Sequence, residues 1–123
     1  MADSFTSKAP DSAKVYLISP LDGATVSNPF TIQFGLSGMG IAPAGIDLPE
    51  TGHHHLLVDL EALPDLGKAL SATEHIKHFG GGQTEATLTL PPGEHTLQLL
   101  LANYVHSPHE PPVLSEPITI TVE

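Results

Sequence analysis

The chain has 123 residues, a formal net charge of −10 and no cysteine. This length predicts one domain, and the lack of cysteine excludes disulfides, thiolate metal sites and thiol catalysis. The basic residues are four lysines with no arginine, so we expect no nucleic-acid partner. No apolar run approaches the roughly 20 residues of a membrane span, so we expect no membrane insertion.

The first stretch of the chain, residues 1–12, is small and polar and poor in large apolar groups. Such a composition predicts a disordered leader, followed by a folded domain over residues 13–123. The leader is similar to the mature start of an exported protein after removal of a signal peptide. We therefore expect a periplasmic or secreted protein.

Alternating apolar and polar residues predict six strands, separated by turns rich in glycine and proline. Residues 61–83 form a long excursion that takes the place of a further strand, and no convincing long helix is present. This pattern predicts an all-β, antiparallel immunoglobulin-like β-sandwich of six to seven strands. The six predicted strands cover residues 14–19, 30–37, 53–60, 84–90, 94–102 and 115–122.

Two apolar residues, Leu57 and Leu100, are predicted on the outward side of their strands. Either residues 61–83 cover these leucines or a second subunit does, so a homodimer is one of two open arrangements.

Three consecutive histidines open the strand predicted over residues 53–60. Alternation places His54 toward the core with Leu56, Val58 and Leu60, and it places His53 and His55 on the other face with Leu57 and Asp59. Along a strand, His53 and His55 are about 6.5–7 Å apart and can converge on one ion. Alternating strand directions predict that seven histidines gather at one end of the sandwich and that His95, as a structural residue, lies at the other.

This gathering predicts a histidine-rich metal site, built from the 37–51 loop, the start of the histidine strand, the 75–85 segment and the 104–112 loop. Imidazole ligands without thiolate suit copper or zinc. The main candidate ligands are His53, His55, His78, His106 and His109. Weaker or supporting candidates are His54, His75, Met39, Asp59 and Glu85.

Two other functions stay open. The histidines could form a metal-free network that fastens loops or recognises a protein partner. A small metal-dependent enzyme would need a base such as Glu74 or Glu85. No nucleophile motif is present, so the sequence assigns no catalytic residue.

Five stretches of the chain resemble a family of short exported bacterial immunoglobulin-like domains of unassigned function. The resemblance covers about residues 14–122 and implies an immunoglobulin-like fold, export and a polar patch at the motifs. It implies no particular activity. It depends more on His78 than on His75, and it includes His95. The motifs are Gly38–Gly45 (GMGIAPAG), Thr51–Asp59 (TGHHHLLVD), His78–Glu85 (HFGGGQTE), Pro92–Leu99 (PGEHTLQL) and His106–Val113 (HSPHEPPV).

Overall fold

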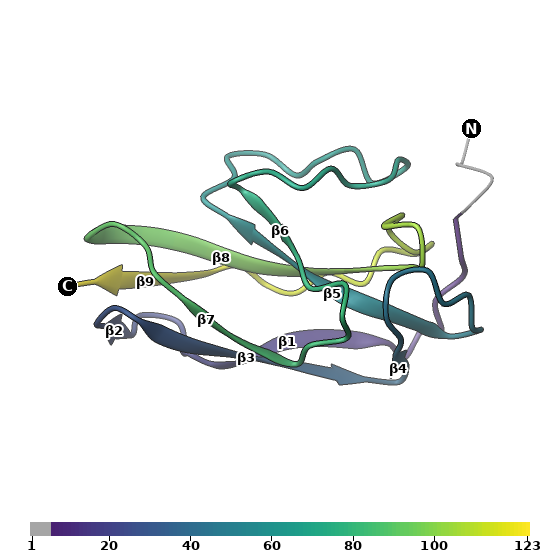
Figure 1. Cartoon of the computed structure of the whole chain (residues 1–123), viewed down its shortest axis with the longest axis horizontal. Helices are drawn as coiled ribbons and strands as arrows, with labels where there is room; N and C mark the ends of the chain where they lie inside the picture. Colours follow the sequence, from purple (N-terminus) through teal and green to yellow (C-terminus); the bar gives the residue numbers. More distant parts are fainter. Residues whose placement is uncertain (1–5) are drawn as a thin grey trace.

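The computed structural model describes residues 6–123, which form two β-sheets packed face to face (Figure 1). One sheet has the strand order β1-β3-β7, and the other has the order β2-β9-β8-β5-β4 with β6 paired to β5. Within this part of the chain there is no helix, and hence none that is long and apolar enough to cross a membrane. The strands are β1 (Lys14–Ser19), β2 (Thr25–Val26), β3 (Phe30–Ser37), β4 (Gly40–Ile41), β5 (Thr51–Val58), β6 (Ile76–His78), β7 (Glu85–Leu88), β8 (Gly93–Ala102) and β9 (Ile118–Val122).

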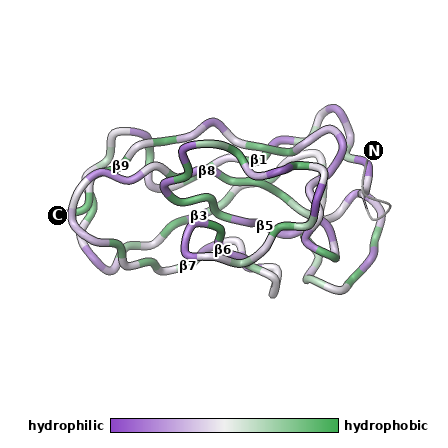
Figure 2. The backbone as a smooth tube through the Cα atoms, turned by 90° about the horizontal axis from the view of Figure 1, so that it is seen from above, coloured by the Kyte–Doolittle hydropathy of each residue, from purple (hydrophilic) through white to green (hydrophobic). Residues whose placement is uncertain are grey.

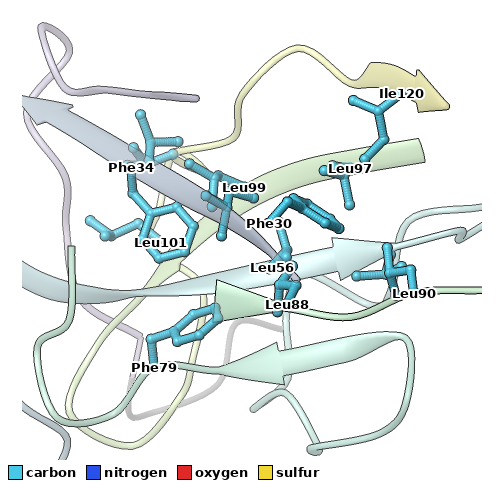
Figure 3. Packing of buried hydrophobic residues seen from close by; sticks show 14 of the residues in the cluster. Phe30, Phe34, Leu56, Phe79, Leu88, Leu90, Leu97, Leu99, Leu101 and Ile120 are labelled. Atoms are coloured by element: carbon cyan, nitrogen blue, oxygen red, sulfur yellow. The ribbon is translucent and has the colours of Figure 1, made fainter. Parts of the chain in front are cut away.

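The main core lies between the two sheets. Hydrophobic and hydrophilic positions follow one another along the backbone (Figure 2), and in β3 the buried Phe30, Ile32 and Phe34 alternate with exposed residues. Burial of each large apolar side chain contributes about 1.5–3 kcal/mol to folding. The core residues that Figure 3 labels are Phe30, Phe34, Leu56, Phe79, Leu88, Leu90, Leu97, Leu99, Leu101 and Ile120.

A second apolar cluster covers the outer face of the larger sheet. Leu57 of β5 and Leu100 of β8 are buried there under Leu70 and Ile76. Leu70 belongs to the chain that loops between β5 and β6, above these strands in Figure 1, and Ile76 begins β6. The excursion after β5 therefore covers the outward leucines, and they give no reason to invoke a second subunit.

The predicted all-β sandwich is confirmed, with differences at the strand ends. All six predicted strands are present, and the short strands β2, β4 and β6 are added to them. Two of these additions, β2 with β9 and β4 with β5, form parallel pairs, whereas the other strand pairs are antiparallel. The immunoglobulin-like assignment stays a prediction.

The end of β5 corrects the predicted placement of Leu60. The strand ends at Val58, and Asp59 has a positive φ of 57° that turns the chain away from the sheet. Leu60 therefore packs against the outer cluster and not in the core between the sheets.

Part of the segment predicted as a leader packs against the folded domain. The Ala9 amide donates to the Glu110 carbonyl at 3.1 Å, and the Glu110 amide donates to the Ser7 carbonyl at 3.0 Å. Ala9 is also buried in the core cluster. These contacts tie residues 7–9 to the folded domain, whereas residues 1–5 lie outside the described part.

Candidate metal centre

His53 and His55 lie on the outer face of β5, where alternation predicted them. Pairing with β8 holds this part of the strand, with His53 opposite Ala102 and His55 opposite Leu100. Both histidines are fully buried, and the ring of His106 packs edge-on against each of them. Their ring centroids are 4.6 Å apart, so two neighbouring imidazoles share one enclosed space.

A tight turn after β8 brings His106 to the same place. The side-chain oxygen Oδ1 of Asn103 accepts hydrogen bonds from the amides of Val105 and Ser107, and the His106 amide donates to the Asn103 carbonyl at 2.9 Å. His106 adopts a positive φ of 63°, and its carbonyl accepts from the Leu70 amide at 2.8 Å. The turn therefore fixes the backbone that carries this ring.

Three ring nitrogens from these histidines converge. Nδ1 of His106 lies 3.1 Å from Nε2 of His53 and 3.1 Å from Nε2 of His55, and all three atoms lie within 4.8 Å of one another. Nitrogens bound to one tetrahedral zinc ion at 2.0–2.1 Å would be about 3.3 Å apart. Two of the three spacings in the triad are thus close to those of a metal-bound set.

A backbone contact sets the tautomer of His55. Its Nδ1 lies 3.3 Å from the His53 carbonyl oxygen, to which it donates as N–H. In the neutral ring this leaves Nε2 as a bare lone pair that faces His106. Metal-ligating histidines commonly have their other ring nitrogen held in this way.

Burial makes the two strand histidines poor bases. Desolvation, with smaller contributions from neighbouring histidines, lowers the pKa of His53 to about 4 and the pKa of His55 to about 2. Both rings are therefore neutral at pH 7, and neutral imidazole is the form that binds metal ions.

His78 lies at the edge of the triad. It is opposite His55 in the pairing of β5 with β6, and its ring centroid is 4.4 Å from those of both His55 and His106. Its Nε2 is buried and has no hydrogen-bond partner within the described chain. Desolvation also lowers the pKa of His78.

His54 and His109 lie at the predicted end but on the other side of β5. His54 points into the core, where its ring contacts Phe34 at a centroid distance of 4.9 Å, and burial lowers its pKa to about 4. His109 donates from Nε2 to the Thr51 carbonyl at 3.1 Å. A Cβ on Gly52 would meet the His109 ring at 2.8 Å, and Gly52 shares the core-side face with His54. The structure therefore does not bring His109 into the triad.

The prediction that His75 joins the other histidines was wrong. Because β6 runs antiparallel to β5, His78 lies opposite His55, whereas His75 lies beside Val58. These two positions are three residues apart along the sheet, a distance of about 10 Å. There Nδ1 of His75 donates to the Val58 carbonyl at 2.8 Å. A pair of histidines three residues apart would share a face in a helix but does not along an extended chain.

His95 lies at the opposite end, as predicted. Its Nδ1 is 2.7 Å from Oδ2 of Asp59, and its Nε2 is 2.7 Å from the Pro91 carbonyl oxygen. The hydrogen bond with Asp59 raises the pKa of His95, since both ring nitrogens face acceptors. Asp59 therefore supports His95 rather than the triad.

The remaining candidates lie elsewhere. Met39 follows β3 and packs against the core between the sheets. Glu85 lies on β7 of the opposite sheet, where it pairs with Gln33, and Glu74 is exposed beside His75. No carboxylate of the described residues joins the group of converging nitrogens.

The positioning role of Asn103 was not predicted from the sequence. Asn is a common turn residue because its side chain bonds to backbone amides two or more residues ahead. Asn103 stands directly after the predicted strand, three residues before His106, and that spacing was the available signal.

Comparison with known proteins adds a family and no activity. Residues 32–123 match the family described as "Domain of unknown function (DUF4399)", and the matched range includes all three converging histidines. No curated protein and no solved structure matches the chain. The match spans well over half of the chain, and this protein therefore belongs to the DUF4399 family.

Proposed function

We propose that this domain binds one copper or zinc ion through Nε2 of His53, Nε2 of His55 and Nδ1 of His106. The observation that carries the proposal is the pair of 3.1 Å distances from His106 to the two strand histidines. With His55 in the tautomer described above, the two contacts are not both ordinary hydrogen bonds: a proton on Nδ1 of His106 faces two acceptors, and a proton on Nε2 of His53 leaves the contact between His106 and His55 without one. A cation at the common point would instead satisfy all three lone pairs.

The choice of copper or zinc follows from the donor set. The converging group contains imidazole nitrogen alone, with neither thiolate nor carboxylate. Imidazole favours copper, zinc and neighbouring transition metals over magnesium or calcium, which prefer oxygen ligands. The net charge of −10 adds a long-range attraction for any cation.

A competition titration against a chelator tests the proposal. We expect wild-type protein to bind one Zn²⁺ or Cu²⁺ per chain, and we expect His106→Ala to weaken binding by at least about 100-fold. His106 is half-buried on a turn, so its removal should leave the sheets intact. The double variant His53→Gln, His55→Gln should show the same loss.

A matched control is available in the same chain. His75→Ala also removes one imidazole but acts about 10 Å along the sheet, and it should leave the affinity unchanged. The proposal fails if wild-type protein binds both ions with a Kd of about 1 mM or weaker. It also fails if His75→Ala weakens binding as much as His106→Ala does.

The same contacts favour a second candidate, a metal-free histidine network. His106 joins the turn after β8 to β5, so the three rings could serve only to fasten that turn. In that case wild-type protein would bind no metal, and His106→Ala would lower the melting temperature of chelator-treated protein. Metal binding by the wild type decides between the two.

A further inference from the structure

The triad leaves one neighbouring imidazole without a defined role. His78 lies on β6, opposite His55, and its ring is close to two of the three proposed ligands. The two candidate bases, Glu74 and Glu85, lie away from the three converging histidines. His78 is therefore the nearest candidate for the remaining coordination position.

The hydrogen bonds of His78 resemble those of His55. A hydrogen bond with the backbone of Ser71 engages the ring, while Nε2 is buried and without a partner in the described part of the chain. An imidazole with one nitrogen bound to a carbonyl and the other bare is arranged as a metal ligand. The unpaired Nε2 would otherwise carry the cost of an unsatisfied buried polar atom.

Five of the six ring spacings among these histidines are close to those expected for four ligands around one ion. With a metal–nitrogen bond of 2.0–2.1 Å, the centroids of two bound imidazoles at 90–110° lie about 4.5–5.2 Å apart. The observed centroid distances among the triad are 4.6, 4.9 and 5.3 Å, and those from His78 to His55 and His106 are both 4.4 Å. Nε2 of His78 is outside the group of nitrogens within 4.8 Å of one another, so a small rotation of this ring must complete the set.

We infer that His78 is the fourth ligand, so that the ion is enclosed by four imidazoles with no position left for water. This inference rests on the proposed function and deepens it. Catalytic zinc sites keep three protein ligands and one position for water or substrate, whereas closed sites use four protein ligands. A closed site holds its ion and does not activate water, so the domain would store, carry or be stabilised by metal.

The variant His78→Asn tests this role. Asparagine retains a polar group near the position of Nδ1 for the Ser71 bond but has nothing at the position of Nε2. We expect at least a tenfold loss of Zn²⁺ affinity, since even loss of a residue that only supports a ligand costs about 10–100-fold. Lys77→Ala, on the adjacent residue of β6, is the matched control and should bind Zn²⁺ as the wild type does.

A second measurement reports directly on water bound at the ion. Wild-type protein loaded with Cu²⁺ should relax bulk water protons only weakly, because no water exchanges at the ion. Loaded His78→Asn should relax them strongly, because water takes the vacated position.

The outcomes separate this inference from the proposed function. If wild-type protein binds no metal, the proposed function itself fails. If metal binds but His78→Asn changes neither the Zn²⁺ affinity nor the water relaxation, the triad remains and the fourth ligand is refuted. Strong water relaxation by the wild type would also refute the closed site, even if the variant failed to fold.

Discussion

Replacing His54 by leucine should stabilise the protein. His54 is 1% exposed, and neither of its ring nitrogens has a hydrogen-bond partner in the described structure. An unpaired buried polar group costs about 1–3 kcal/mol, and the neutral ring has two such nitrogens. Against this, an imperfect fit of leucine costs up to about 1.5 kcal/mol, and loss of the ring contact with Phe34 costs about 0.5–1.5 kcal/mol.

The midpoints of these ranges give a net gain of about 2 kcal/mol for His54→Leu, which for a chain of this length raises the melting temperature by about 8 °C. Urea denaturation and thermal unfolding at pH 7, both with a chelator present, measure the effect on metal-free protein. Zn²⁺ affinity should stay unchanged, because His54 points to the opposite side of β5 from His53 and His55. A loss of stability by 1 kcal/mol would show that the ring nitrogens are satisfied, and a loss of affinity would refute the assignment of faces.

Two further predictions concern other parts of the fold. The hydrogen bond with Asp59 raises the pKa of His95, so the protonated His95–Asp59 pair should stabilise the protein fully below about pH 6.5. This contribution to the free energy of unfolding should be lost as pH rises through the raised pKa. Asp59→Asn keeps an acceptor for the Thr96 amide but removes the charge. The unfolding free energy of this variant should therefore change less than that of the wild type between about pH 6 and 9. If the two proteins gave parallel curves of unfolding free energy against pH, the stabilising role of the Asp59–His95 pair would be refuted. Gly52→Ala should destabilise the protein by about 1–3 kcal/mol in urea denaturation, because the new Cβ would lie 2.6 Å from the Ala102 carbonyl oxygen; an unchanged midpoint would contradict this packing.

Strand alternation was sufficient to predict the part of the site that lies on β5. Apolar residues at Leu56 and Val58 mark the core side of this strand, so His54 must share that side while His53 and His55 point outward. The structure has both features, because one buried face strongly specifies the register of a strand. Alternating strand directions likewise predicted that His106 returns to the end where His53 lies.

The contribution of β6 could not be predicted in the same way. This strand has only three residues, and its register depends on pairing with β5 rather than on any pattern within residues 61–83. The sequence therefore could not predict whether His75 lies near His55 or away from it. Nor could the sequence show that His109 packs over Gly52 on the core side, because that contact depends on the path of a proline-rich loop.

The turn that carries His106 also reaches the beginning of the described chain. The Asn103 side chain, which shapes this turn, donates to the Ser7 hydroxyl at 2.9 Å, and Glu110 pairs with residues 7–9 a few positions later. An ion bound to His106 would restrain the whole 103–110 stretch, and the restraint would pass to the segment tethered there. Metal binding at the triad should therefore slow cleavage near residues 7–9 in limited proteolysis.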